Sequence, residues 1–152
     1  MSLHISRATS EYANQLTAVA ISAKRYWNYP EAWIEHWLPQ LTISAEYISS
    51  NEVWMMTDED KPIGFYAVSE TEEGYELSHL WVLPEYIGQG IGKQLFQHAL
   101  ERCKILEVSV LRIESDPNAQ AFYERMGAKK ISENHSQIFG QERILPIMEI
   151  QL

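Results

Sequence analysis

Three successive segments of strand-like pattern, joined by short breaks, most constrain the fold of this chain. Residues 53–57, 63–70 and 75–83 are rich in apolar and aromatic residues and predict three strands. The breaks at residues 58–62 and 71–74 have the turn chemistry of an antiparallel meander. A meander of this kind excludes a doubly wound parallel sheet.

Helices and further strands are expected on both sides of the meander. The N-terminal part predicts a strand over residues 3–7, a helix over 10–24, and short helices after Pro30 and over 45–49. The C-terminal part predicts a helix over 91–106, a strand over 108–114, a helix over 119–126, and strands over 129–134 and 144–152. Pro146 has no N–H to donate and is expected at an edge position. The predicted fold class is therefore mixed α/β, of α+β type, with a mostly antiparallel central sheet flanked by helices.

Composition indicates one globular domain. The chain has 152 residues, 45% of them hydrophobic and 22% charged, with no repeat or Gly/Ser linker, so we expect residues 1–152 to form a single domain. Twelve Lys and Arg against 21 Asp and Glu give a net charge of −9, which argues against a nucleic-acid partner and suits a cationic or neutral ligand.

The sequence also indicates the compartment of the protein and the partners to expect. No segment has the pattern of a signal peptide or a membrane span, so no membrane partner is expected. Cys103 is the only cysteine, which fits a reducing compartment, and we expect a cytoplasmic protein. The histidines have no metal-ligand spacing, so no metal site is expected.

A glycine-rich loop follows the last strand of the meander. Residues 87–93 are IGQGIGK and stand between a strand and a helix. Gly88, Gly90 and Gly92 let the backbone bend and leave N–H groups unobstructed at a helix N-terminus, which can hold a pyrophosphate. The spacing matches neither the dinucleotide-binding nor the P-loop pattern. Glycines that serve only as turn residues of a flexible loop are the alternative interpretation.

Two segments together resemble a known family. Residues 76–92, ELSHLWVLPEYIGQGIG, are similar to the acyl-CoA motif of the GNAT N-acetyltransferase superfamily. Residues 116–127, DPNAQAFYERMG, are similar to its second signature, a helix ending in F-Y-x-x-x-G. Both occur in the expected order, separated by a helix and a strand of suitable length. The resemblance implies the GNAT acyl-CoA N-acyltransferase fold, with acetyl-CoA as co-substrate.

The resemblance also implies a set of donor-binding residues. The backbone around Trp81 and Val82 would pair with the pantetheine arm, and an N–H near Val82 would polarise the thioester carbonyl. Asn118 and Tyr123 would lie beside the thioester sulfur. The loop residues expected to hold the pyrophosphate are Gly88, Gln89, Gly90, Gly92 and Lys93.

This chain departs from the family pattern at two positions. Ile87 stands where the motif usually begins with Gln or Arg, so one side-chain contact to phosphate is absent. Asp116 stands at a position that is often Asn. Because a carboxylate near phosphates is unfavourable, we prefer Asn118 as the ligand contact.

An acid and a base are expected from the same resemblance. Tyr123 would be the general acid that protonates the leaving thiolate. A lysine-like amine arrives protonated at neutral pH, and Glu76 occupies a strand position where some family members carry a catalytic Glu or His. Ser78 shares its face and could hold a water relay. An exposed strand carboxylate is an equal alternative for Glu76, and a packed structural histidine is the preferred interpretation of His79.

An aromatic segment lies where the family's variable acceptor-site helices occur. Tyr26, Trp27 and Tyr29 fall on a loop and could line an acceptor pocket or stack on a cation, with packing as an equal alternative. Trp33 and Trp37 are one helical turn apart and are expected to pack into the core.

The predicted function is N-acetyl transfer from acetyl-CoA to a primary amine of a small molecule or peptide, by direct attack in a ternary complex. A non-catalytic acyl-CoA-binding regulatory module and an acyltransferase for a longer acyl-CoA are the alternatives. A homodimer is compatible with the sequence.

Overall fold

A computed structural model describes residues 2–152 of the protein, and the chain divides into two compact units. The first comprises the residues up to 68 together with 79–99, and the second comprises residues 69–78 and 100–152. Seven strands are hydrogen-bonded in the order β1-β2-β3-β4-β5-β7-β6. The pairs β1–β2, β2–β3, β5–β7 and β6–β7 are antiparallel, whereas β4–β5 is parallel. The mixed, mostly antiparallel fold class predicted from the sequence is confirmed.

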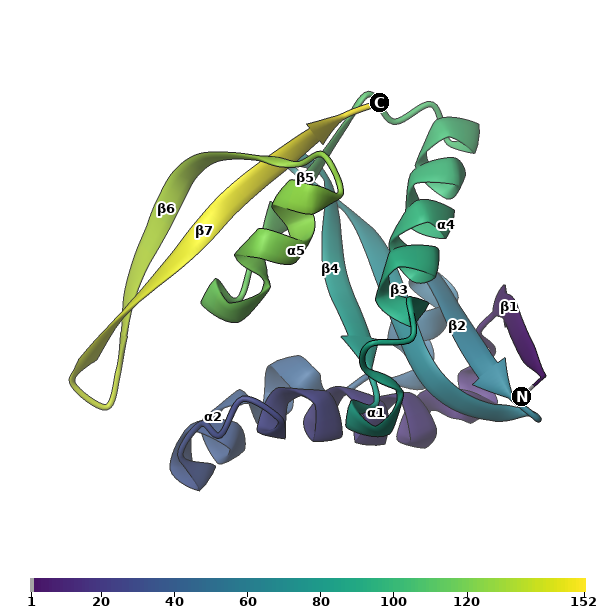
Figure 1. The fold of residues 1–152 in the computed structure, drawn as a ribbon, viewed down its shortest axis with the longest axis horizontal. Coiled ribbons are helices and arrows are strands. Elements are labelled where there is room, and N and C mark those ends of the chain that lie inside the picture. The colour runs from purple at the N-terminus through teal and green to yellow at the C-terminus, as the bar shows by residue number, and fades with distance from the viewer. Residues whose placement is uncertain (1) are drawn as a thin grey trace. The chain divides into compact units, whose positions relative to one another are not determined.

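The first unit holds the N-terminal strands and helices (Figure 1). Its elements are β1 (Leu3–Arg7), η1 (Ser10–Tyr12), α1 (Ala13–Arg25), α2 (Glu31–Leu41), α3 (Ala45–Ser50), β2 (Glu52–Asp58), most of β3 (Lys61–Thr71), the end of β4 (Gly74–Val82), η2 (Pro84–Tyr86) and the first part of α4 (Ile91–Ile105). The boundaries differ from the predicted ones by only a few residues for most of these elements.

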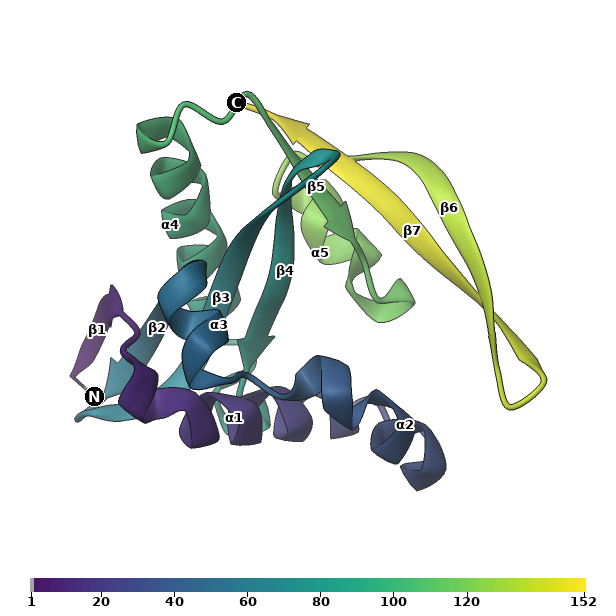
Figure 2. The same ribbon diagram turned by 180° about the vertical axis from the view of Figure 1, so that it is seen from behind.

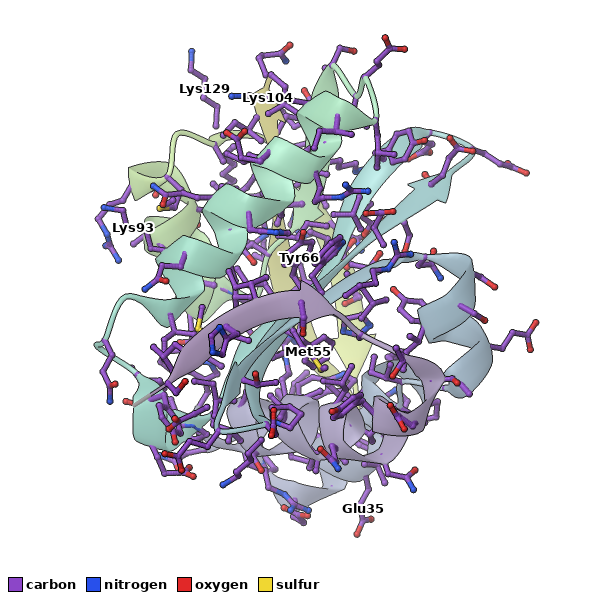
Figure 3. All side chains as sticks on the ribbon, turned by 90° about the vertical axis from the view of Figure 1, so that its right-hand side faces the viewer. Glu35, Met55, Tyr66, Lys93, Lys104 and Lys129 are labelled. Atoms are coloured by element: carbon purple, nitrogen blue, oxygen red, sulfur yellow. The ribbon has the colours of Figure 1, made fainter. Side chains whose placement is uncertain are left out.

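Packing in the first unit follows the apolar pattern of its segments. The inner faces of α1, β2 and β3 contribute fully buried side chains, and Met55 and Tyr66 lie in the interior whereas Glu35 of α2 points outward (Figure 3). The hydroxyl of Tyr66 is hydrogen-bonded to Nδ1 of His98 at 2.7 Å. Helix α3 packs on η1 and β2 (Figure 2), and Ser44 caps it by accepting a hydrogen bond from the Tyr47 N–H at 3.0 Å.

The second unit contains the rest of the sheet and one short helix. Its elements are the turn between β3 and β4, the end of α4, β5 (Val110–Glu114), η3 (Pro117–Ala119), α5 (Gln120–Arg125), β6 (Lys129–Ile138) and β7 (Gln141–Gln151). Strands β6 and β7 form a long hairpin (Figure 1) whose turn places Phe139 and Gly140 at positive φ, 48° and 80°. Both strands are longer than predicted.

The position of Pro146 differs from the sequence-based expectation. Pro146 lies in β7, which pairs with β5 on one side and β6 on the other, so it is not in an edge strand. The ladder between β5 and β7 ends at Glu114 and Ile147, and beyond it the Pro146 carbonyl accepts from the Ser115 N–H at 2.8 Å. A central strand tolerates this proline because its missing N–H falls just past the end of the ladder with β5.

None of the helices in residues 2–152 has the length and hydropathy of a membrane-crossing segment.

Candidate active site

The glycine-rich loop is an exposed turn at the start of α4. Gly88 and Gly90 have φ of 87° and 79°, and a Cβ added to either would meet no atom within 4 Å. Glycine is therefore required here by the backbone conformation rather than by crowding. The first i→i−4 bond of the helix runs from the Gln94 N–H to the Gly90 carbonyl at 3.1 Å, so the N–H groups of residues 91–93 have no acceptor within the helix.

Side chains around the loop anchor it and leave its outer side open. Tyr86, two residues before Gly88, donates a hydrogen bond from its hydroxyl to Asp58 Oδ2 at 3.0 Å. This bond links the segment that precedes the loop to the end of β2. Ile87 is 46% exposed, and the Lys93 side chain points away from α4 (Figure 3). The loop and first helical turn carry no carboxylate over residues 87–93, which suits an anionic ligand at this helix N-terminus.

The end of β4 is held close to β3 by a glycine. A Cβ on Gly64 would lie 2.9 Å from the Trp81 carbonyl oxygen and 3.0 Å from Leu95 Cδ1. The Leu83 N–H donates to the Ile63 carbonyl at 2.8 Å and fixes the strand end. Of the nine residues of β4, only Tyr75 and Glu76 are paired with β5 in the described chain. The later residues of β4 therefore have no β5 partner on their backbone.

Trp81 and His79 share one face of β4 and are hydrogen-bonded to each other. The Trp81 indole N–H donates to His79 Nδ1 at 2.9 Å, which makes Nδ1 an acceptor and places the proton of the neutral ring on Nε2. The His79 ring also contacts Tyr47 and Phe65. Burial lowers the pKa of His79 to about 4. These contacts agree with the packed structural histidine preferred from the sequence.

The low pKa of His79 gives a pH dependence of stability. The folded pKa is about 4 and the ordinary value is 6.5, so this stabilisation is complete above pH 6.5 and is lost as the pH falls towards 4. The resulting loss of unfolding free energy is about 3 kcal/mol, because a pKa difference of one corresponds to about 1.36 kcal/mol. We expect His79→Asn, which keeps an acceptor but cannot titrate, to flatten the dependence of urea unfolding free energy on pH between 7 and 4.5. His135→Asn, at an exposed histidine, is the control, and an unchanged slope in His79→Asn would contradict the assignment.

Tyr123 is a buried residue of α5 in the second unit. Its side chain is 7% exposed, and its pKa is raised by burial and then by the negative charge of Asp116. The phenol therefore keeps its proton at neutral pH, as a general acid requires.

Asp116 organises the turn that precedes α5. Its Oδ1 accepts from both the backbone N–H and the side-chain amide of Asn118, each at 2.9 Å, and its Oδ2 lies 3.8 Å from Arg143 Nη2. This carboxylate is engaged within the protein, so its place at a position often occupied by Asn has a structural explanation. Asn118 is exposed, with its amide nitrogen directed to Asp116.

Glu76 lies near charged residues of both signs in the second unit. Burial raises its pKa, and Glu114 raises it further, whereas Arg112, its register partner on β5, lowers it. Arg112 is ion-paired with Glu73. Ser78 donates its hydroxyl to Ser69 Oγ at 2.9 Å. Glu76 is thus a half-buried carboxylate with an elevated pKa, unlike the exposed strand carboxylate of the alternative interpretation.

The aromatic segment divides into two groups in the first unit. Tyr26 and Trp27 are 46% and 42% exposed and pack edge to face, with centroids 4.9 Å apart. Tyr29 instead stacks on Trp33 at 5.9 Å and meets the edge of Trp37 at 5.0 Å. Contrary to expectation, Trp33 and Trp37 are only half-buried, because Ile34 and Leu41 supply the buried side of α2.

Lys24 is a residue of this region that sequence reasoning missed. It belongs to α1, is 9% exposed, and places Nζ 4.3 Å from the centroid of Trp37 and 5.0 Å from that of Tyr29. The signal that could have found it was its spacing, four residues after the buried Ala20 on the apolar side of the helix.

The predicted site residues fall into the two units. The first unit contains the loop residues 88–93, Trp81, Val82 and the aromatic residues, and the second contains Glu76, Ser78, Asn118 and Tyr123. Among residues 2–152, no three His, Cys, Asp or Glu side chains are grouped so that they could hold a metal ion.

Comparison with known proteins defines the family. A family model described as the acetyltransferase (GNAT) domain matches residues 12–139. The chain belongs to the GNAT family. The peptidyl-lysine N-acetyltransferase YjaB of Salmonella typhimurium is 34% identical over 86 residues, which cover 56% of this chain and 55% of that protein. This GNAT chain thus matches little more than half the length of that relative.

Solved structures share the fold of this GNAT protein. The PaiA N-acetyltransferase of Thermoplasma acidophilum, in complex with coenzyme A, has a TM-score of 0.82 at 22% identity, covering all of both chains. YncA of Salmonella typhimurium, solved with its cofactor acetyl-CoA, has a TM-score of 0.73 at 16% identity, covering all of this chain and 95% of its own.

Proposed function

We propose that the protein transfers the acetyl group of acetyl-CoA to a primary amine. The observation that carries this proposal is the exposed loop in which Gly88 and Gly90 adopt positive φ immediately before the N-terminus of α4, where the first helical N–H groups have no acceptor within the helix. The GNAT family supports acyl-CoA as the donor, and structural neighbours were solved with coenzyme A and with acetyl-CoA.

In this proposal the donor is held largely by backbone groups. The N–H groups of Gln89, Gly90, Gly92 and Lys93 bind the pyrophosphate, without help from a side chain at Ile87. The backbone near Trp81 and Val82 pairs with the pantetheine arm as it would with an added strand, because within residues 2–152 β4 pairs with β5 only at Tyr75 and Glu76.

The chemical step needs one proton acceptor and one proton donor. Glu76 takes a proton from the protonated acceptor amine, directly or through water, and passes it to solvent, and the neutral nitrogen attacks the thioester carbonyl carbon. The N–C bond forms, the attacking nitrogen gives its next proton to Glu76, the C–S bond breaks, and the sulfur of CoA takes a proton from Tyr123. The proton on Glu76 then returns through water to the Tyr123 phenolate, so that the protonated amine and acetyl-CoA become the amide, CoA thiol and one proton released to solvent. Asn118 contacts the donor beside the sulfur.

The relatives favour one class of acceptor. The curated proteins similar to this chain are named peptidyl-lysine N-acetyltransferases, so the acceptor in their names is a lysine within a peptide. We propose a lysine-like alkyl amine, on a peptide or on a small molecule, as the acceptor here. The exposed aromatic pair Tyr26 and Trp27 would form part of the surface that receives it, together with Tyr29.

Donor binding can be tested with a pair of glycine variants. Gly90 and Gly140 have φ of 79° and 80°, and a Cβ at either would meet no atom within 4 Å. Each change to alanine should cost about 1 kcal/mol of folding stability through the same backbone strain. We expect Gly90→Ala, but not Gly140→Ala, to weaken the thermal stabilisation that acetyl-CoA gives, which is about 2.7 kcal/mol at a hundred times its dissociation constant.

Thermal stabilisation by ligands, together with release of CoA thiol, separates the candidate functions. Stabilisation by NAD and not by acetyl-CoA would refute the proposal. Stabilisation by acetyl-CoA without release of CoA thiol in the presence of lysine peptides would identify a non-catalytic acyl-CoA-binding module. Faster thiol release with butanoyl-CoA than with acetyl-CoA would identify an acyltransferase for longer chains.

A further inference from the structure

A cavity of about 490 Å³ opens on the surface of the first unit. It is lined by one face of α1, by the turn between β2 and β3, and by the segment that follows β4 and enters η2. None of its lining residues is assigned above to the donor, the acceptor or the chemical step. The volume is in the range of ligand pockets and is many times the roughly 30 Å³ that one water occupies. The cavity is therefore large enough for several side chains of a partner.

The floor of this cavity is apolar. Val19 of α1 and Leu83 after β4 line it, and they are otherwise covered by the protein, with 3% and 8% of their surface exposed. Ala18 and Pro62 continue the apolar lining on either side. A partner that covers this floor with hydrocarbon would remove apolar surface from water, which favours binding.

Carboxylates outnumber cations on the rim of the cavity. Glu59 and Asp60 form the turn between β2 and β3, Glu85 lies in η2, and Lys61 is the one basic residue of the lining. Within residues 2–152, none of these four side chains is in an ion pair or a hydrogen bond. Three carboxylates against one ammonium leave an excess of two negative charges. We call the cavity with this floor and rim the α1 groove.

The walls of the α1 groove are anchored to the sheet. Tyr86, next to Glu85, donates a hydrogen bond to Asp58 at the end of β2, and the Leu83 N–H donates to the Ile63 carbonyl of β3. The chain then runs from η2 directly into the glycine loop. The groove is thus preformed, and a partner bound in it lies against the segment that leads to the donor loop.

The chemistry of the groove selects one kind of partner. Exposed ion pairs are individually weak, so an open rim would hold a single small ammonium ion poorly. A basic peptide segment can instead lay the hydrocarbon stems of its cationic side chains, and apolar side chains between them, on the floor while the charged ends reach the rim. The net charge of −9 also favours encounter with a basic partner. We propose that the α1 groove binds a basic, partly apolar segment of a peptide or protein.

The proposed function gives this segment a role. It belongs to the acceptor, at a distance along the acceptor chain from the lysine that receives the acetyl group, and it raises the local concentration of that lysine. This role rests on the proposed function, whereas binding of the segment does not.

Binding can be measured without acetyl-CoA, by the fluorescence anisotropy of a labelled Arg-Leu-Arg-Leu-Arg peptide with blocked termini. We expect saturable binding of this peptide by the wild type. Binding of Arg-Gly-Arg-Gly-Arg, which lacks the apolar side chains, should be weaker by about tenfold or more. The peptide Glu-Leu-Glu-Leu-Glu should not bind. Equal affinity for the leucine and glycine peptides would contradict a role for the apolar floor.

Two charge variants locate the peptide on the rim. Asp60→Asn combined with Glu85→Gln removes two rim charges and should weaken binding of Arg-Leu-Arg-Leu-Arg by about fivefold or more. Glu35→Gln combined with Glu46→Gln removes two exposed charges of α2 and α3 and should leave the affinity unchanged. The net charge changes equally in both, so equal weakening would mean that the peptide responds only to the overall charge.

Two alanine variants locate the peptide on the floor. Ala18 and Ala32 are both exposed alanines of helices, and only Ala18 lines the groove. Ala18→Arg places a bulky cation in the groove and should abolish binding, whereas Ala32→Arg should bind as the wild type does. Unchanged binding in Ala18→Arg would place the peptide elsewhere.

Two other occupants of the groove have distinct signatures. Displacement of the peptide by an equal concentration of butylammonium chloride would make the groove a site for small cations. Wild-type dimers that Ala18→Arg dissociates, measured by sedimentation, would make the occupant a second copy of this chain. Either result would overturn the inference.

Turnover separates docking from the reaction. A Gly-Lys-Gly acceptor peptide is compared with the same peptide joined to Arg-Leu-Arg-Leu-Arg by a flexible Gly/Ser linker. We expect the extension to lower KM by about tenfold at similar kcat in the wild type, and this difference to disappear in Ala18→Arg. An unchanged KM, or a difference that persists in Ala18→Arg, would refute docking of the acceptor in the groove. Absence of turnover with both peptides would refute acetyl transfer, while anisotropy would still decide on the binding of the basic segment.

Discussion

Tyr123→Phe is expected to lower kcat by a factor of about 100 or more while acetyl-CoA affinity changes little. General acid catalysis typically contributes about 10² to 10⁴ in rate, and the phenol is needed mainly when the thiolate leaves. The raised pKa of Tyr123 keeps its proton in place at neutral pH. The change removes one oxygen from a side chain that is 7% exposed, so packing volume is nearly preserved. Steady-state kinetics with detection of the CoA thiol, together with titration of acetyl-CoA, measure both quantities.

A second tyrosine provides the control for this experiment. Tyr12 in η1 lies outside the proposed site, and Tyr12→Phe removes the same hydroxyl group without an expected effect on kcat. Full activity of Tyr123→Phe would mean that the thiolate leaves without a proton donor. A thiol pKa near 8.5 makes such departure chemically feasible. Loss of acetyl-CoA affinity in parallel with kcat would instead indicate a binding role for the hydroxyl.

Glu76→Gln should produce a defect that depends strongly on pH. The variant keeps the shape of the side chain and removes the proton acceptor, so kcat/KM should fall most at low pH, where the amine is most protonated. The defect should shrink as alkali deprotonates the amine without help. Because the pKa of Glu76 is raised, the wild type should lose activity on acidification at a higher pH than an ordinary glutamate would give.

Two further variants test whether Glu76 is the titrating group. The Arg112 charge lowers the pKa of Glu76, so Arg112→Met should raise that pKa and move the acidic limb of the pH–rate profile to higher pH. Glu101→Gln, at an exposed glutamate of α4, should leave the profile unchanged. A wild-type profile in Glu76→Gln would place the base elsewhere. A water held by Ser78, whose hydroxyl donates to Ser69, would be the next candidate.

The pattern of the sequence determined the elements and the glycine loop. Segments rich in apolar and aromatic residues between short turns predicted β2, β3 and β4, and helical spacing predicted α1 and α4, because these patterns depend only on neighbouring residues. The loop was also accessible from sequence, since G-x-G-x-G needs no distant partner to permit positive φ. The structure agrees at Gly88 and Gly90.

Tertiary structure alone decided the environment of the candidate groups. Glu76 owes part of its raised pKa to Glu114, 38 positions later, and the charge of Asp116 acts on Tyr123 in addition to burial. Pro146 is accommodated in an inner strand because the ladder with β5 ends beside it. A local sequence pattern does not predict which of these residues lie close together in the folded chain.

Lys24 shows the same limit most clearly. The helical spacing of Lys24 indicates an inward position. The spacing does not predict that the rings of Tyr29, Trp37 and Trp81 lie around its ammonium group. Those rings come from a loop, a helix and a strand separated by up to 57 residues from the lysine. Sequence determines which side a residue faces through local geometry, whereas the charge and the rings that it meets there depend on contacts between distant segments, which only folding brings together.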